Sequence, residues 1–356
     1  MSTTGYGPGG DTAGSVIQSA GDQVIDVQGN NIASNLDIDA GVVDNSRAII
    51  AMNAAGQDQT ILVQNGNLTL DGGTALDTQA LIESANTQNI GTAATSAIDG
   101  YVAVRGGSGD SADAIIRSEA EQSLLIAGND RLMGGTPFTD AALGLYGGSE
   151  DVTDGGDAII TQTNGTARQT IDVTTGNLEL IGGTGLDAVA AIRAAGDNEA
   201  VGEEAQRILV QSGDLIVRAD QDAGGLNNTG SFAEILASNT DNASQLIDVD
   251  GDVEVSGGDD QGEYARVTAA GTAVGVLTQD MNAEGSMTVT GGVGADAYAR
   301  VETLTTDAAS NQQLVVQNTL TPMAAAGLTV QGAADSANTG NEAGIVSAAT
   351  GSDAQV

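Results

Sequence analysis

Apolar residues recur along this chain in three short patterns that follow one another in a fixed cyclic order. The first is Gln-x-apolar-x-apolar, as in Gln169-Thr-Ile-Asp-Val; the second is apolar-x-apolar, as at Leu68/Leu70; the third is Ala-x-Ile or Ala-x-Val, as at Ala80. Each pattern alternates apolar and outward residues, which is the period of a half-buried β-strand. Copies of the first pattern begin at Gln23, Gln59, Gln122, Gln169, Gln206, Gln245 and Gln312, with weaker copies at Ser96 and Gly275.

The spacing of the patterns predicts the fold. From the first apolar residue of the second pattern to the Ala of the third is 12 residues in six of nine repeats, and a tenth copy of the third pattern, Ser15-Val-Ile17, precedes them all. Three short strands in a repeat of about 36 residues indicate a right-handed, three-sided parallel β-solenoid of nine to ten coils, each rising by about 4.8 Å. We expect one solenoid over residues 15–349, an N-terminal arm at 1–14 and a polar tail at 350–356.

Stacking of equivalent residues explains what the interior should contain. Ile, Leu and Val should form ladders inside the solenoid, and the Ala positions should form a ladder of small residues. The Gln of the first pattern faces the same side as the Ile and Val that follow it. We therefore expect an inward ladder of glutamines whose amides hydrogen-bond from coil to coil.

Composition agrees with a narrow, tightly turning coil. The 356 residues include 51 Gly, only 2% aromatics, and no His, Cys or Trp. Zinc clusters, disulfide frameworks and nucleophiles that need His or Cys are thereby excluded. A globular α/β fold would need helical periodicity over 10–15 residues, and its best candidate, residues 188–195, is too short and lies on a strand position.

The net charge of −38 excludes partners that need a basic surface. All ten cationic residues are Arg, and they are scattered along the chain. Nucleic acid and anionic membranes are therefore not expected partners. No apolar stretch approaches the roughly 18 residues of a membrane span, so no membrane insertion is expected.

The acidic residues recur at two positions of the repeat. The outward residue of the first pattern reads Asp26, Leu62, Asp99, Leu125, Asp172, Leu209, Asp248 and Thr278, which suggests Asp in every second coil. The arc after the second pattern carries further aspartates, which favour such turns because they accept backbone N–H bonds; in the alternative interpretation they bridge neighbouring coils through Ca²⁺. This candidate metal edge consists of Asp44, Asp77, Asp110, Asp154, Asp187 and Asp296. No other cofactor is expected.

Two enzyme-like signals have structural explanations. The string Gly183-Thr-Gly185-Leu-Asp-Ala188 resembles a dinucleotide-binding fingerprint, but similar strings recur at the same corner of other coils. Paired carboxylates could serve a solenoid enzyme that degrades polysaccharides, yet such sites need basic and aromatic groups in a groove. We do not expect an enzyme, and polysaccharide degradation stays the least favoured alternative.

Two segments of the sequence resemble the repeats of a known protein family. Residues 169–185 and 59–74, which include Gly176-Asn-Leu-Glu-Leu-Ile-Gly-Gly and Gly66-Asn-Leu-Thr-Leu-Asp-Gly-Gly, resemble repeats of filamentous-haemagglutinin-like exoproteins. These are large bacterial surface and secreted β-helix adhesins. The resemblance covers residues 13–349 and implies an extracellular or cell-surface location; the secretion module of that family is not evident in this chain.

The two ends of the predicted solenoid suggest a function. Neither shows a capping element, and both end in the third strand type, so the last coil of one copy could receive the first coil of the next and build a filament. In the alternative interpretation the chain is a segment of a longer polypeptide, whose neighbouring parts supply the caps. The expected interface residues are Ser15, Val16, Ile17, Leu328, Val330, Ala343 and Ile345. The alternative is an adhesin segment that binds glycans or cell surfaces through the insertions 127–142, 218–232 and 317–327.

Overall fold

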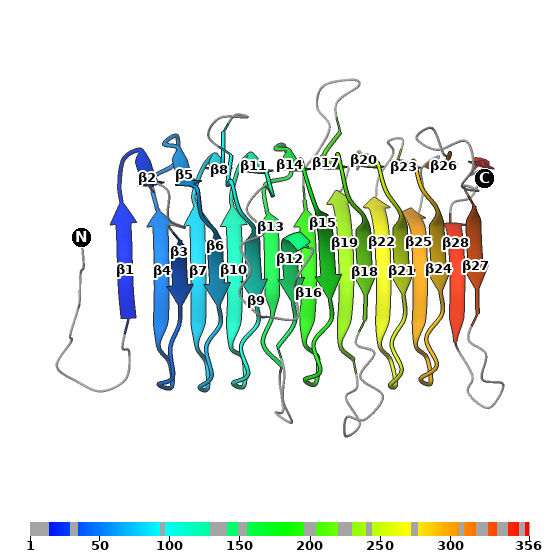
Figure 1. The fold of residues 1–356 in the computed structure, drawn as a ribbon, viewed down its shortest axis with the longest axis horizontal. Coiled ribbons are helices and arrows are strands. Elements are labelled where there is room, and N and C mark those ends of the chain that lie inside the picture. The colour runs from blue at the N-terminus through cyan, green and yellow to red at the C-terminus, as the bar shows by residue number, and fades with distance from the viewer. Residues whose placement is uncertain are drawn as a thin grey trace.

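Each of the three sequence patterns forms its own parallel sheet, and the chain visits the three sheets in turn. The computed structural model describes residues 14–28, 35–92, 97–128, 141–148, 155–195, 204–219, 230–239, 244–271, 277–305, 310–317, 327–332, 341–348 and 353–355. Figure 1 shows the strands side by side along the long axis, with β1 at one end and β28 at the other. The described residues therefore form a three-sided parallel β-solenoid of nine to ten coils, as the sequence predicts.

Sheet A contains the strands of the third pattern and runs the full length of the solenoid. It has ten strands, in the order of the chain. They are β1 (Gly14–Ser19), β4 (Arg47–Met52), β7 (Gln79–Ser84), β10 (Asp113–Ser118), β13 (Ala158–Gln162), β16 (Val189–Ala194), β19 (Phe232–Asn239), β22 (Tyr264–Gly271), β25 (Tyr298–Thr305) and β28 (Glu342–Ala348).

Sheet B contains the glutamine pattern and also has ten strands. They are β2 (Gln23–Gln28), β5 (Gln59–Gln64), β8 (Gln88–Ile90), β11 (Gln122–Ile126), β14 (Gln169–Val173), β17 (Gln206–Val210), β20 (Ser244–Val249), β23 (Leu277–Ala283), β26 (Ser310–Val316) and β29 (Asp353–Gln355).

Sheet C contains the second pattern and has nine strands. They are β3 (Leu36–Asp39), β6 (Leu68–Asp71), β9 (Val102–Arg105), β12 (Ala141–Tyr146), β15 (Asn177–Ile181), β18 (Leu215–Arg218), β21 (Val253–Ser256), β24 (Met287–Thr290) and β27 (Leu328–Gln331). The core between the three sheets is one continuous cluster of aliphatic side chains from all of them.

Tight corners join sheet C to sheet A and explain the high glycine content. The backbone is left-handed at Asn45, Asp77, Ser111, Asp187 and Asp296, which lie at these corners. At Gly107 a side chain has no room, because an added Cβ would stand 1.9 Å from the carbonyl oxygen of Gly73 in the preceding coil. At this corner the two backbones can therefore approach so closely only because the residue is glycine.

The structure corrects the expected register of sheet B in two coils. In the third coil the glutamine strand is β8, which begins at Gln88 and not at Ser96. In the eighth, Gln279 pairs in register with Gln245, so Gly275 does not begin the strand. The expected alternation of Asp along the outer face is therefore wrong. Gly91 stands where the pattern predicts Asp99, and Asn282 pairs with Asp248 where the pattern predicts Thr278.

The first and last described strands lie at the edges of the expected solenoid. The first strand begins at Gly14, one residue before the expected start. Asp353–Gln355, inside the expected polar tail, forms β29 and pairs with β26. The tail therefore contributes a short tenth strand to sheet B.

Candidate assembly surfaces at the two ends of the solenoid

A continuous ladder of nine buried glutamines runs through the interior beside sheet B. In each coil the side-chain Nε2 donates to Oε1 of the glutamine in the preceding coil, over 2.7–2.9 Å. The same amide donates to a backbone carbonyl of sheet A, for example from Gln169 to Arg193, 3.1 Å away. The ladder confirms the predicted inward glutamines and consists of Gln23, Gln59, Gln88, Gln122, Gln169, Gln206, Gln245, Gln279 and Gln312.

The ladder has a direction, so its two ends differ chemically. All amide groups donate toward the N-terminal end and all Oε1 atoms accept from the C-terminal side. At the first coil, Nε2 of Gln23 donates a hydrogen bond to the carbonyl of Ala51. No described glutamine precedes Gln23 to accept the second bond that this amide makes in every other coil. At the other end, Oε1 of Gln312 is buried and has no hydrogen-bond partner among them. One end therefore offers a donor and the other an acceptor.

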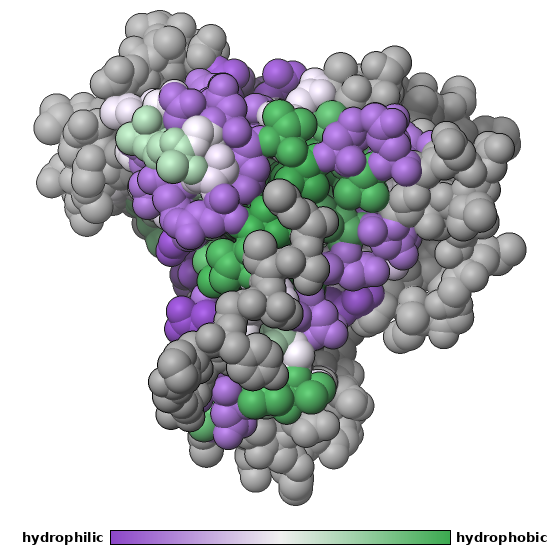
Figure 2. All heavy atoms as spheres, turned by 90° about the vertical axis from the view of Figure 1, so that its left-hand side faces the viewer, coloured by the Kyte–Doolittle hydropathy of each residue, from purple (hydrophilic) through white to green (hydrophobic). Residues whose placement is uncertain are grey.

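The N-terminal end exposes side chains whose equivalents in the inner coils are buried. Ile17 of β1 faces inward in register with Ile50, yet it is 45% exposed where Ile50 is 3% exposed. Ile25 and Leu36, on the other two sheets, are only partly buried. Figure 2 shows this end as a group of hydrophobic residues with hydrophilic residues around it. The core of the solenoid is thus open to solvent at its first coil.

The C-terminal end exposes the same ladders. Val330 of β27 is 45% exposed, while Val289, its partner in the preceding coil, is fully buried. Leu328 is 36% exposed, and Ala343 and Ile345 of β28 are only partly buried. The two ends therefore present matching apolar rows together with unpaired edges of described strands.

The residues expected at the interface all lie on terminal strands. Ser15, Val16 and Ile17 belong to β1, Leu328 and Val330 to β27, and Ala343 and Ile345 to β28. The side chain of Val16 does not belong to an interior row. Strand alternation turns it to the outer face of sheet A, where it is in register with Ile49. Sequence reasoning missed Gln23 and Gln312 as end groups; the repeated Gln pattern was the signal that could have indicated them.

The acidic corner residues occupy two different positions in their turns: Asp77, Asp187 and Asp296 take the left-handed one, and Asp44 and Asp110 the one before it. Asp77 and Asp187 have φ of 53° and 54°, the left-handed conformation that Asp and Asn adopt more readily than other non-glycine residues. Asp44 stands one position earlier in its turn, where its carboxylate accepts the backbone N–H of Leu76 in the next coil. The candidate calcium ligands thus do not form a single stack of equivalent positions, and Asp154 lies outside the described residues.

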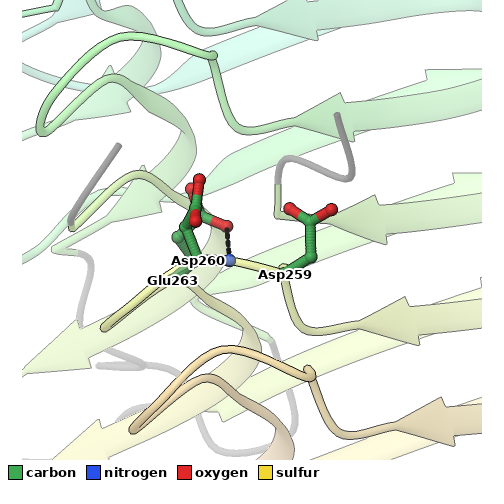
Figure 3. Close-up of side chains that lie close together, drawn as sticks. All are labelled: Asp259, Asp260 and Glu263. Carbon is green, nitrogen blue, oxygen red and sulfur yellow. Dashed lines mark hydrogen bonds between the residues drawn. The ribbon is translucent and has the colours of Figure 1, made fainter. Parts of the chain in front are cut away.

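The carboxylates that do meet at a corner are different ones. Ligand atoms of Asp259, Asp260 and Glu263 lie within 4.8 Å of one another in the turn before β22 (Figure 3). Glu263 is fully buried, and its carboxylate accepts hydrogen bonds from the Ser231 hydroxyl at 2.9 Å and the Asp260 amide at 3.0 Å. These bonds tie the corner to the preceding coil and give Glu263 a structural role.

The outer face of sheet A carries a stack of aromatic rings in the C-terminal half. Tyr264 is sandwiched between Phe232 and Tyr298, with centroids 4.6 and 4.9 Å apart and nearly parallel planes. Both faces of the central ring are covered, so Tyr264 offers no open ring face to a sugar. Burial raises the pKa of the Tyr264 and Tyr298 phenols above the ordinary tyrosine value, against the opposing effect of neighbouring Arg266.

Beside this stack, arginines alternate with carboxylates across the strands. Glu234 is almost fully buried and bonds Arg193 at 2.5 Å on one side and Arg266 at 2.6 Å on the other. Arg300 continues the row and reaches Glu342 on β28 at 2.5 Å. Opposite charges placed one strand apart hold neighbouring coils together on a face that remains partly exposed.

The three insertions expected to carry an adhesive role lie mostly outside the described residues. Within the part of the chain that the structure describes, there is no helix long and apolar enough to cross a lipid bilayer. No family model, curated protein or solved structure matches this chain.

Proposed function

We propose that this chain is the non-catalytic structural subunit of an extracellular filament, in which the C-terminal end of one solenoid stacks on the N-terminal end of the next. The observation that carries the proposal is the exposure of interior rows at both ends, where Ile17 and Val330 are each 45% exposed. Burying these rows against a second copy removes apolar surface from water at about 25 cal/mol per Å².

The two ends are complementary and not identical, which favours an open chain of subunits. One end offers the donor of Gln23 and the other the buried acceptor of Gln312. Contacts between two different surfaces of the same molecule generate open filaments unless they close into a ring. Strand pairing across the junction would continue the three sheets, as in strand addition to an exposed edge.

The large negative charge supports end-to-end over side-by-side association. A net charge of −38 repels neighbouring rods along their whole length. The interior rows exposed at the two ends are apolar and therefore add no charge repulsion of their own. The extracellular location is supported by the repeat style, which resembles that of secreted β-helix proteins.

Electron microscopy of purified protein over a concentration series tests this function. Uniform unbranched fibres, one solenoid wide, are expected. The variants Leu36→Glu on β3 and Val330→Glu on β27 each place a charge in an apolar row at one end. They should prevent fibre formation while leaving the circular dichroism spectrum unchanged. Val293→Glu, at a 45% exposed position on a corner, is the matched control and should form fibres normally. Monomers of the unmodified protein at high concentration would overturn the proposal.

A further inference from the structure

The number of strands in the three sheets restricts how two copies can join. Sheets A and B have ten described strands each, and sheet C has nine. If a second copy simply stacked its β1 on β28 and its β2 on β29, then β3 would lie two coil steps from β27. Among the described strands, sheet C would then have a one-strand gap at every junction, with no described partner for the backbone groups on either side. A junction that continues all three sheets needs equal numbers of strands in them.

We propose, on the basis of the end-to-end filament above, that the junction forms by strand exchange. β28 of one copy takes the place of β1 in the next, and β2 of the incoming copy takes the place of β29. The order across the junction is then β25, β28, β4 in sheet A, β26, β2, β5 in sheet B, and β27, β3, β6 in sheet C. Each copy contributes nine complete coils, and each sheet has the same number of strands.

The glutamine ladder supports the replacement of β29. In the single chain, Ala354 of β29 stands in register beside Gln312, and alanine has no side-chain donor for the buried Oε1. The incoming β2 instead places Gln23 at this position. Its amide then donates to Gln312 Oε1, as Gln312 itself donates to Gln279 at 2.8 Å. Exchange therefore satisfies a buried acceptor that no described residue satisfies within one copy.

Charge pairing supports the replacement of β1 by β28. In β1 the residue in register with Arg47 is Gly14, and Arg47 makes no ion pair with any described residue. In β28 the equivalent residue is Glu342, which is already bonded to Arg300 and whose side chain is 62% exposed. After exchange, Glu342 lies between Arg300 and the incoming Arg47, the same alternation that Glu234 makes with Arg193 and Arg266.

β1, the strand that β28 replaces in the exchanged junction, is also weakly held. Val16 and Ile17 of β1 are 38% and 45% exposed, and β1 pairs with β4 on one side only. β29 has three residues. β1 and β29 therefore serve as exchangeable covers of the end coils, as in domain swapping between protomers.

Disulfide trapping distinguishes the two junctions, because the chain has no cysteine of its own. In the exchanged junction, V24C on β2 lies in register beside Q313C on β26 of the neighbouring copy, about 4.8 Å away and within disulfide reach. In simple stacking, V24C of the incoming copy lies beside Q355C on β29, because Gln355 pairs in register with Gln313. Q313C is then two strands, or about 9.6 Å, from V24C, which is beyond disulfide reach. V24C and Q313C stand at opposite ends of one chain, so any bond joins two copies.

The experiment mixes V24C protein with Q313C or with Q355C protein under mild oxidation, after circular dichroism confirms folding. Exchange predicts covalent dimers with Q313C and few with Q355C. It also predicts that subunits repeat along the fibre axis about every 43 Å, the height of nine coils, whereas simple stacking gives a repeat of about 48 Å. Fibres that cross-link through Q355C, or through neither position, overturn the exchange and leave end-to-end stacking in place. Loss of fibres and cross-links altogether overturns the proposed function on which the exchange rests.

Discussion

Nε2 of Gln169 lies 2.8 Å from Oε1 of Gln122, although the two residues are 47 positions apart in the chain. The intervening coil carries insertions, yet the two amides meet with the same geometry as every other pair in the ladder. The ladder therefore fixes the register of sheet B independently of loop length. A buried amide that bonds both ways is costly to remove, because its partners cannot turn to water.

Gln169→Leu tests the energetic weight of the ladder. The substitution keeps the volume but removes the only described donor to Gln122 Oε1, one donor to the Arg193 carbonyl and the acceptor of Gln206 Nε2, which keeps its bond to the Leu236 carbonyl. We expect a loss of about 3 kcal/mol in the free energy of unfolding, measured by urea denaturation. Gln211→Leu, which removes an exposed amide bonded to Asp172, should change it by less than about 0.5 kcal/mol. Equal effects of the two variants would contradict a structural role for the ladder.

Glu234→Gln tests the buried carboxylate between two arginines. The variant keeps the shape but leaves Arg193 and Arg266 facing a neutral group. We expect a loss of about 2 kcal/mol, below the 3–5 kcal/mol of fully buried pairs because both guanidinium groups are partly exposed. Glu254→Gln, in the half-exposed pair with Arg218, should cost less than about 1 kcal/mol by the same denaturation measurement. A larger loss at Glu254 would contradict this ranking.

Substitutions at Asp77 separate the turn role from calcium binding. Asn also tolerates the left-handed backbone, so Asp77→Asn should be nearly neutral, whereas Asp77→Val should cost about 1–2 kcal/mol. We expect the melting temperature of the unmodified protein to be the same in chelator and in added Ca²⁺. A Ca²⁺-dependent rise that Asp77→Asn abolishes would instead support the cation edge.

The stacked tyrosines predict a loss of stability at alkaline pH. Burial raises the pKa of Tyr264 and Tyr298 in the folded state above the value of about 10 in the unfolded chain. The unfolded state therefore loses protons first, and the stabilisation is complete below pH of about 10 and is lost as the pH rises through the folded-state pKa. Denaturation measured between pH 9 and 11.5 should show this decline, and the double variant Tyr264→Phe/Tyr298→Phe should show a shallower one. An identical slope in both proteins would exclude these phenols as its source.

The repeating aliphatic pattern predicted the solenoid, because stacked coils require the same inward residues at the same positions. The register of sheet B was predictable from the sequence only in those coils where the strand keeps the full Gln-x-apolar-x-apolar pattern. β8 has three residues, and Ile98, which pairs with Ile126, comes after an interruption that breaks the pattern. β23 has Met281 and Ala283 where other coils have Ile and Val, so Gln279 went unrecognised.

The end surfaces were only partly predictable from sequence. The apolar rows at Ile17 and Val330 follow from the repeat, since terminal copies of an inward pattern lack a neighbour. The unpaired acceptor of Gln312 depends on which way the amides point, and the strand counts depend on β29, whose three residues carry no apolar pattern. Both features emerge from three-dimensional pairing and not from residue type.

Fibre diffraction from aligned filaments of the unmodified protein tests the central claim most directly. Solenoids stacked end to end place every strand perpendicular to the fibre axis, which predicts a strong meridional reflection at about 4.8 Å together with an axial subunit repeat of about 43 Å. A protein that stays monomeric at all concentrations, or fibres without a meridional reflection at the strand spacing, would contradict the claim that this chain is a filament subunit built by stacking its ends.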